Sequence, residues 1–254
     1  MRHAAPAAGK LRAIICDIDG CLSPESSTPF DVESLMRIAE HNRLAQCRGD
    51  RPVLTACSGR PQPFVEAMCR LLSNHTVPCI AENGVWMYHP GTNEYIMDPA
   101  ITIEQREAVH DAARWLATQY GGRGVSQQPG KVASISLYHK DTGFLKSLEA
   151  PLREQFAANG WPLRVSSTWL YINCDLEHVS KGTGLDRLMA STGLEKERLA
   201  GIGDTMGDLA IRERVSWFAC PANAGAEIRA HADYVSPRPE AKGVLDVLTE
   251  LGLG

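Results

Sequence analysis

Short apolar runs alternate with helical stretches near both ends of the chain, and this alternation limits the possible folds more than any other feature. Residues 11–16 and 52–57 are predicted strands, and a predicted helix over 31–47 separates them. The same order returns near the C-terminus, where predicted strands at 199–203 and 217–220 also alternate with helices. Alternating strands and helices are typical of a parallel sheet that helices cover on both faces. We therefore expect an α/β protein.

The middle third of the chain has a different pattern, which indicates an inserted α+β unit. Segments 85–88 and 94–97 flank Pro90-Gly91 and predict a hairpin. Thr102 and Gln105 form a capping box for a helix that stops at Gly121. Pro151 predicts a kink or break in a later helix. We expect residues 1–84 and 179–254 to form a core, and 85–178 a cap joined to it through two chain crossings.

Several side chains are expected to be buried. The apolar face of helix 31–47 is predicted to consist of Val32, Leu35, Met36 and Ala39. The strand over 131–138 alternates and is predicted to have one solvated face. All eight cysteines lie in apolar segments of a large chain, which favours reduced, buried thiols; they are Cys16, Cys21, Cys47, Cys57, Cys69, Cys79, Cys174 and Cys220.

Composition and charge exclude several classes of protein. The chain has 26 basic and 30 acidic residues and a net charge of -4, which favours neither nucleic acid nor an acidic membrane surface as partner. Every apolar stretch is shorter than the roughly 18 residues that a transmembrane helix needs. No apolar segment of a signal peptide follows the basic residues at the start. We expect a cytoplasmic protein, and leave open whether it is a monomer or a dimer.

Two pairs of aspartates follow predicted strands. Asp17 and Asp19 come directly after the first strand and before Gly20, and Asp204 and Asp208 follow the strand at 199–203. Taken alone, the first pair also suits a turn, because Asp and Gly are common turn residues. Ligands of parallel sheets collect at the carboxyl ends of strands, where both pairs are expected to lie. Four carboxylates there predict a Mg²⁺ site, with water and a substrate phosphate completing the coordination.

Two further segments fit phosphate binding. Ser58-Gly59-Arg60 follows the strand at 52–57 and offers a hydroxyl and backbone N–H groups to an anion. Lys181 would bring a positive charge to the same rim. Singly, Ser58 also suits a helix cap and Lys181 a solvated surface position. A dinucleotide turn at 201–207 is a competing interpretation, but the spacing is G-x-G-x-x-x-G and Asp204 would face the pyrophosphate.

At this point the sequence resembles the haloacid dehalogenase-like superfamily, and more closely its Cof-type phosphatases with a type II (IIB-like) cap. The motifs that carry the resemblance occur in the family's order along nearly the whole chain. They are Asp17-Ile18-Asp19-Gly20-Cys21-Leu22, Ser58-Gly59-Arg60, Asn83-Gly84, Lys181-Gly182, Gly203-Asp204 through Asp208, Asn223-Ala224, and the segment from Ala232 to Val244. The resemblance implies a Rossmann-like core with the cap inserted after Asn83-Gly84.

The resemblance also implies a mechanism. Asp17 would attack the phosphorus of a phosphomonoester and form an aspartyl-phosphate, while Asp19 would protonate the leaving oxygen and then activate water. Mg²⁺ would be held by Asp17, the backbone carbonyl of Asp19, Asp204 and Asp208, the last directly or through water. The transferring oxygens would be held by Ser58 and Lys181.

Two departures from the family pattern stand out. Gly207 occupies the place where the family commonly has Asn, so one hydrogen bond beside the metal ligands is missing. Cys21 stands where Thr is usual. It would serve as a small packing residue or, alternatively, as a nucleophile with a low pKa.

The substrate is expected to be a small phosphorylated metabolite, such as a sugar phosphate. Residues expected to bind it are Ser58, Gly59, Arg60, Asn83 and Lys181. In similar proteins the cap sets specificity, which makes Lys131, His139 and Arg164 candidates for contacts to a sugar or a carboxylate, although each also suits an ordinary surface position. The resemblance extends to sugar-phosphate phosphatases, including mannosyl-3-phosphoglycerate and sucrose phosphatases, and to phosphomannomutases. A phosphomutase is therefore an alternative, and a non-catalytic phosphometabolite-binding protein is another.

Overall fold

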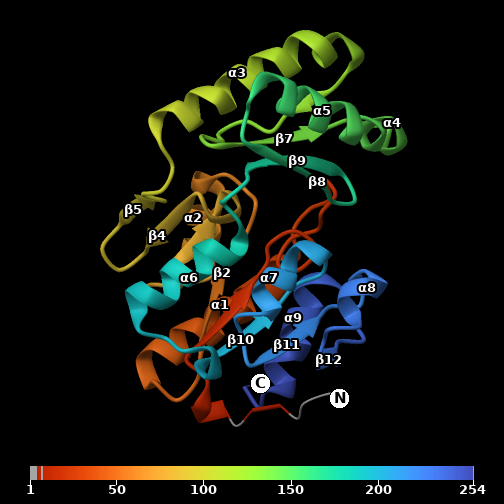
Figure 1. Ribbon diagram of the computed structural model, residues 1–254. Coiled ribbons are helices and arrows are strands. Elements are labelled where there is room, and N and C mark those ends of the chain that lie inside the picture. Colours follow the sequence, from red (N-terminus) through yellow and green to blue (C-terminus); the bar gives the residue numbers. More distant parts are fainter. Residues whose placement is uncertain (1–4, 7, 254) are drawn as a thin grey trace.

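The computed structural model describes residues 5, 6 and 8–253, and its lower half is a five-stranded parallel sheet (Figure 1). The strand order is β12-β11-β10-β1-β2, and all four pairings are parallel. The strands are β1 (Ala13–Cys16), β2 (Val53–Ala56), β10 (Leu199–Ile202), β11 (Trp217–Cys220) and β12 (Tyr234–Val235). The expected α/β class with a parallel sheet is confirmed.

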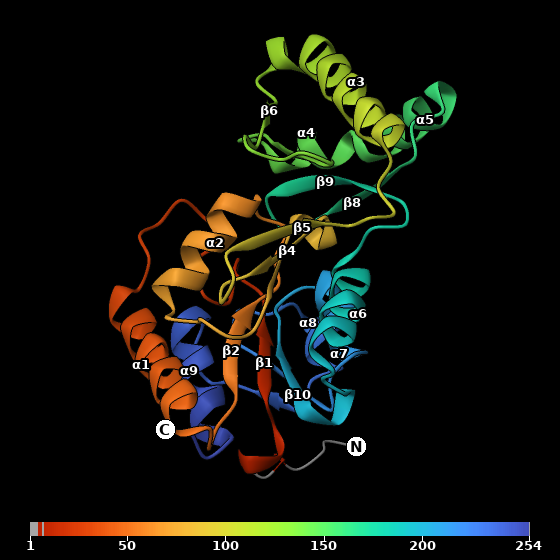
Figure 2. The same ribbon diagram turned by 90° about the vertical axis from the view of Figure 1, so that its left-hand side faces the viewer.

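Helices cover both faces of this sheet, as Figure 2 shows. One face carries α1 (Val32–Arg48), α2 (Gln62–Leu71) and α9 (Glu240–Glu250), and the other α6 (Lys181–Thr192), α7 (Leu209–Arg212) and α8 (Ala226–Arg229). Side chains of β1 alternate between the two apolar clusters that result. Ile14 packs with the cluster of α1 and α9, and Ile15 with that of α6, α7 and α8.

A three-stranded antiparallel sheet adjoins the parallel one beside β2. It consists of β3 (Cys79–Ala81), β4 (Trp86–His89) and β5 (Glu94–Met97), and a single bridge between Cys57 and Ile80 joins it to the end of β2. The predicted hairpin around Pro90-Gly91 is therefore confirmed. The hairpin strands β4 and β5 lie within the segment proposed as the cap, but they form a sheet with β3, which precedes that segment. The boundary between core and cap at residue 85 therefore stays a prediction.

A second unit with its own core lies above the carboxyl ends of the parallel strands (Figure 1). Its antiparallel sheet has the order β6-β7-β9-β8, and three helices lie on the face turned away from the parallel sheet. The elements are β6 (Ser126–Gln127), β7 (Ser134–Tyr138), β8 (Leu163–Ser167), β9 (Tyr171–Leu176), α3 (Ile103–Tyr120), α4 (Thr142–Ser147) and α5 (Glu149–Asn159). The capping box of α3 forms as predicted, and the helix that contains Pro151 is interrupted at Leu148.

The remaining elements are single 3₁₀ turns: Ala8–Lys10, Glu82–Gly84, Gly121–Arg123, Lys196–Arg198 and Met206–Asp208. The last of these begins the helical segment between β10 and β11, in which α7 spans only Leu209–Arg212. None of the helices in the described part of the chain is both long enough and apolar enough to span a membrane.

Three expectations about burial are wrong. On α1, Val32 and Met36 are exposed, whereas the polar His41 and Asn42 are buried. The strand β7 has no solvated face along most of its length, because its first four residues are buried between the outer helices and the parallel-sheet unit. Cys47 is exposed at the end of α1, while the other seven cysteines are buried and all eight are free.

Candidate active site

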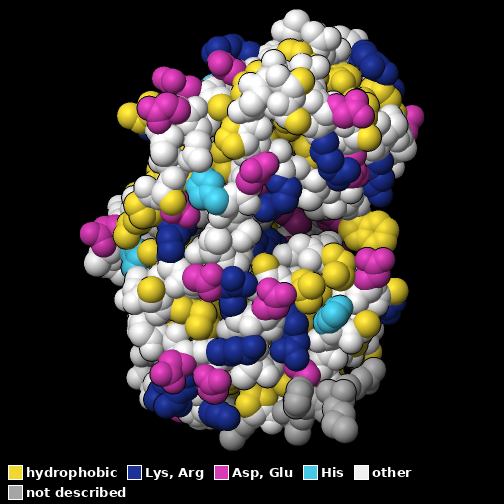
Figure 3. Space-filling model, in the orientation of Figure 1, with side chains coloured by type: hydrophobic (Ala, Val, Ile, Leu, Met, Phe, Trp, Pro, Cys, Tyr) yellow, Lys and Arg dark blue, Asp and Glu magenta, His cyan; other side chains and the backbone are white. Residues whose placement is uncertain are grey.

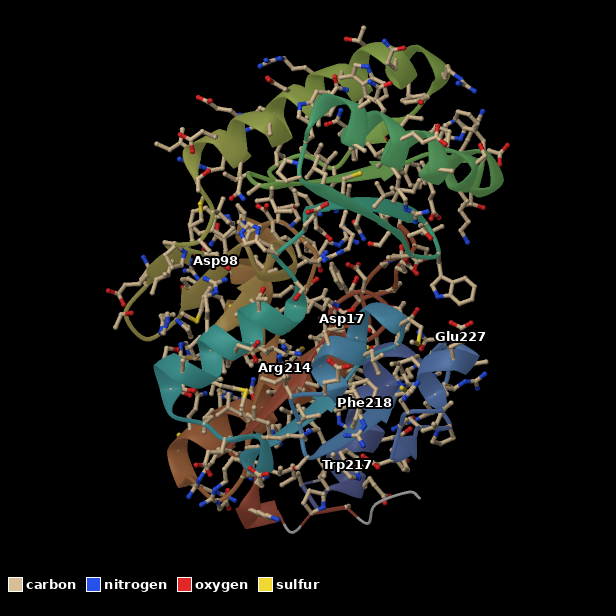
Figure 4. All side chains as sticks on the ribbon, in the orientation of Figure 1. Asp17, Asp98, Arg214, Trp217, Phe218 and Glu227 are labelled. Atoms are coloured by element: carbon tan, nitrogen blue, oxygen red, sulfur yellow. The ribbon has the colours of Figure 1, made fainter. Side chains whose placement is uncertain are left out.

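Charged side chains from separate elements meet where the parallel strands end. Asp17 follows β1, Ser58 follows β2 by two residues, and Asp204 follows β10. Lys181 begins α6, whose first turn points toward the same place. Figure 4 shows Asp17 between the parallel sheet and the upper unit. The strand ends thus gather residues that lie up to 187 positions apart in the sequence, from Asp17 to Asp204.

Lys181 links two of the buried carboxylates. Its Nζ lies 2.8 Å from Oδ2 of Asp17 and 2.7 Å from Oδ1 of Asp208, and the lysine is only 8% exposed. The other oxygen of Asp208 accepts from the backbone N–H groups of Asp204 and Thr205, both at 3.0 Å. Asp208 therefore positions both the lysine and the loop that carries Asp204, which gives it a definite place despite Gly207 beside it.

Burial and mutual repulsion make the ionised forms of these carboxylates unfavourable in the absence of a metal ion. Burial, and next the charge of Asp208, raise the pKa of Asp17 to about 8. The same two causes, with Asp17 added, raise the pKa of Asp204 to about 9. Burial by itself would lower the pKa of Lys181, but Asp17 and Asp208 raise it well above its usual value. The lysine is thus firmly protonated, and one positive charge faces three carboxyl groups.

The donor set of this cluster fits a divalent cation. Oxygen atoms of Asp17, Asp204 and Asp208 lie within 4.8 Å of one another. Oδ1 of Asp204 is buried and has no hydrogen-bond partner in the described structure, so it is available as a ligand. A Cβ atom at Gly20, whose φ is +76°, would lie 2.0 Å from Oδ2 of Asp204, so only glycine allows the two segments to approach this closely. Hard oxygen ligands of this kind suit Mg²⁺.

The carboxylate of Asp19 lies apart from this cluster, in an ion pair with Arg60. The Nε of Arg60 lies 3.0 and 2.7 Å from its two oxygens, and Nη2 lies 2.5 Å from Oδ1. The guanidinium also lies over the rings of Phe64, 5.0 Å to the centroid, and Tyr171, 5.9 Å. Because Phe64 belongs to α2 and Tyr171 to β9, Arg60 connects the two units at the position of Asp19.

Ser58, Gly59 and Asn83 form the adjoining wall. The hydroxyl oxygen of Ser58 accepts from the backbone N–H of Arg60 at 3.1 Å, as in a turn cap. A Cβ at Gly59 would lie 3.0 Å from Oδ1 of Asn83, so the glycine lets this side chain approach the strand end. The Nδ2 of Asn83 donates to Asp175 at 3.0 Å, which joins the wall to β9.

The neighbouring Glu82 makes a second connection to the upper unit. Its carboxylate is fully buried and accepts from the backbone N–H groups of Val132 and Ala133 at 3.1 to 3.2 Å, and from the Ser134 hydroxyl at 3.3 Å. Both Glu82 and Asn83 have a left-handed φ, +47° and +53°. This strained turn directs two successive side chains to the upper unit. Glu82 reaches the start of β7, and Asn83 reaches the end of β9.

A cavity of about 410 Å³ lies above the carboxylates, between the two units. On the face drawn in Figure 3 a recess runs between the upper and lower parts of the surface. Asp17, Asp19, Ser58, Gly59, Arg60, Asn83, Lys181 and Asp204 all line the cavity. The structure thus brings together the residues predicted for catalysis and binding, with Asp208 directly beneath through its bond to Lys181.

The three residues predicted for substrate contact in the upper unit have different locations. Arg164 lines the cavity and donates to the backbone carbonyls of Glu177 and Val179. Lys131 bonds to the hydroxyl of Ser136 instead of lining the cavity. His139 packs beneath Gly124 and bonds to backbone carbonyls, so it has a structural role here.

Sequence reasoning missed several residues of the cavity wall, among them Glu25, Tyr171, Asn173 and Asp175. The last three lie on β9, whose alternating pattern predicts a strand but does not indicate which face meets the lower unit. Glu25 lies in a loop without a motif.

Comparison with known proteins agrees with this architecture. The sequence model of the family described as haloacid dehalogenase-like hydrolase matches residues 125–248. A protein from Methanospirillum hungatei JF-1 named phosphoglycolate phosphatase is 24% identical over 241 residues, which cover 94% of this chain and 95% of the relative. One from Methanococcoides burtonii with the same name is 27% identical over the same shares.

Solved structures share the fold at low identity. A haloacid dehalogenase-like hydrolase from Bacteroides thetaiotaomicron superposes with a TM-score of 0.69 at 18% identity, over 95% of this chain and all of that one. The sucrose-phosphatase of Synechocystis sp. PCC6803, solved with sucrose and phosphate, gives a TM-score of 0.67 at 17% identity, over 96% and 98% of the two chains. Together with the family match and the full-length relatives, they show that this chain is similar to the haloacid dehalogenase-like hydrolases over nearly its whole length.

Proposed function

We propose that the protein is a Mg²⁺-dependent phosphatase that hydrolyses a small phosphorylated metabolite, such as a sugar phosphate, through an aspartyl-phosphate on Asp17. The observation that carries the proposal is the buried group of Asp17, Asp204, Asp208 and Lys181 at the floor of a cavity. The names of the relatives support phosphatase activity, since two of them are called phosphoglycolate phosphatase.

In this proposal, an oxygen of Asp17 forms a bond to phosphorus while the bond from phosphorus to the leaving oxygen breaks. Asp19 gives its proton to that oxygen, and later takes a proton from the water that hydrolyses the aspartyl-phosphate. Because Arg60 holds both oxygens of Asp19, it has to release one of them before Asp19 carries a proton. An incoming phosphate dianion offers Arg60 an alternative partner.

Asp17, Asp204 and Asp208, with the backbone carbonyl of Asp19, would hold the Mg²⁺ ion. When bound, the ion supplies positive charge that lets a carboxylate approach a phosphate dianion. Lys181 and Ser58 would hold the transferring oxygens, and Gly59 and Asn83 would shape the wall beside them.

We further propose that residues 1–84 and 179–254 act as the catalytic core and 85–178 as the cap. The separate apolar cluster of the upper unit supports this division. The eight free thiols support a cytoplasmic location.

The test is hydrolysis of p-nitrophenyl phosphate by the purified protein with Mg²⁺. We expect activity that EDTA abolishes and added Mg²⁺ restores, and at least about a 10³-fold loss in Asp17→Asn, which removes the nucleophile. Asp111→Asn, an exposed position on α3, is the matched control and should behave as the wild type. Full activity in Asp17→Asn would contradict the mechanism, and release of an isomer instead of phosphate from a sugar phosphate would indicate a mutase.

A further inference from the structure

Glu25 lies in the wall of the cavity. It belongs to the loop between β1 and α1, and Oε1 accepts from the hydroxyl of Thr168 at 2.7 Å. Thr168 lies in the connection between β8 and β9, so this bond joins the two units in front of the cavity. Both residues line the cavity, and Glu25 is half-buried. A fixed carboxylate therefore faces the space that a leaving group would occupy.

The positive charges that line the cavity already have partners. Arg60 is held by Asp19, and Lys181 by Asp17 and Asp208. Nη2 of Arg164 lies 3.9 Å from Oδ2 of Asp175, and Nη1 and Nη2 donate to the backbone carbonyls of Glu177 and Val179.

Glu25, by contrast, belongs to none of the ion pairs formed within the described part of the chain. Lys131 bonds to the hydroxyl of Ser136 and does not line the cavity. Among the side chains that line the cavity, a second anionic group on the substrate would thus find no unpaired cation, and it would meet the charge of Glu25.

The rest of the upper wall is neutral and polar. It consists of Gln128, Ser136, Ser166, Ser167, Tyr171 and Asn173. Hydroxyl and amide groups of this kind both donate and accept hydrogen bonds, as the hydroxyl groups of a sugar or polyol require. The wall thus matches a neutral leaving group with several hydroxyls.

We propose that Glu25 is a specificity-determining residue, which rejects phosphate esters that carry a carboxylate and so favours a neutral, hydroxyl-bearing leaving group. The proposal rests on the phosphatase function proposed above. The substrate proposed for this chain differs from the one in the names of its relatives, because phosphoglycolate carries a carboxylate beside its phosphate. The physical cause is repulsion between two carboxylates across a cavity that is partly screened from water.

The test compares kcat/KM for glycerol 1-phosphate, which is neutral apart from its phosphate, with that for 2-phosphoglycolate. The wild type should prefer glycerol 1-phosphate. In Glu25→Gln, which keeps an oxygen that accepts from Thr168, the ratio should shift about tenfold toward 2-phosphoglycolate at low ionic strength. Salt should reduce the preference of the wild type, because Glu25 is only half-buried.

Two further variants separate charge from contact. Thr168→Val removes the bond but keeps the carboxylate, and should retain the wild-type ratio. Glu33→Gln changes an exposed glutamate at the start of α1 and should also leave the ratio as it is. An unchanged ratio in Glu25→Gln, or a wild-type preference for 2-phosphoglycolate, overturns the proposal while hydrolysis of glycerol 1-phosphate still supports the phosphatase. If neither ester nor p-nitrophenyl phosphate is hydrolysed with Mg²⁺, both proposals fall.

Discussion

Replacement of Asn42 by leucine should strongly destabilise the core, because this side chain completes the edge of the parallel sheet. β2 is an edge strand whose outer side has no full-length neighbour, since β3 joins it by one bridge only. Oδ1 of Asn42 accepts from the backbone N–H of Leu54 at 2.7 Å, and Nδ2 donates to the carbonyls of Leu54 at 2.9 Å and Leu72 at 2.8 Å. Asn42 thus takes the place of a neighbouring strand and ties α2 to it.

The expected loss follows from these three bonds. Each bond contributes about 1 kcal/mol net, and because Asn42 is fully buried, no water replaces the lost bonds. The total loss is about 3 kcal/mol, out of a free energy of unfolding that is typically about 5 to 15 kcal/mol. Urea unfolding followed by fluorescence measures this, and the midpoint should fall by about 1 M for a slope near 3 kcal/mol/M. Asn159→Leu, which removes one exposed bond to Gln155, should cost less than about 0.5 kcal/mol. A loss below about 1 kcal/mol in Asn42→Leu, or an equal loss in the control, would refute the reasoning.

Three shorter predictions concern the site, the pH dependence and the thiols. Gly20→Ala should abolish Mg²⁺-dependent hydrolysis, because its Cβ would displace Asp204, while Gly121→Ala, with open space around it, should not; initial rates with p-nitrophenyl phosphate decide this. Burial lowers the pKa of His41, so only the unfolded chain takes up its proton near pH 6.5, and stability should fall as the pH drops below that value. Urea unfolding at pH 8 and pH 5.5 measures this loss of stability, which should be smaller in His41→Gln than in the wild type. An equal loss in the two proteins would contradict the assignment. A maleimide should modify one thiol, Cys47, in the native protein and all eight after unfolding, and mass spectrometry would reveal any other number.

The alternation of strands and helices was sufficient to predict the parallel sheet and its covering helices. The partners of side chains were harder to predict, and α1 illustrates why. Its periodicity indicates where apolar residues repeat, but Met36 lies at a position that the core does not cover, whereas Asn42 is buried to satisfy backbone groups of β2. Such hydrogen bonds form because β2 has no full-length neighbour on its outer side. A local sequence pattern carries no information about which strand lies at the edge of the sheet.

For the candidate site, residue positions were predictable and pairings were not. Strand ends placed Asp17 and Asp204 together, since the carboxyl ends of parallel strands meet at one edge. The ion pair of Asp19 with Arg60 depends on the rotamers of two loop residues 41 positions apart. Glu25 belongs to a loop of ordinary composition, and only its contact with Thr168 shows that it faces the cavity.

The strained turn at Glu82 allows motion between the two units to be measured directly. The amide protons of Val132 and Ala133 are bonded to the Glu82 carboxylate, which belongs to the other unit, and not to a neighbouring strand. They can exchange with deuterium in the solvent only when the upper unit separates from this carboxylate. Their exchange rates therefore measure how often the two units separate at this turn, in the free protein and with any bound ester, without a label or a turnover assay.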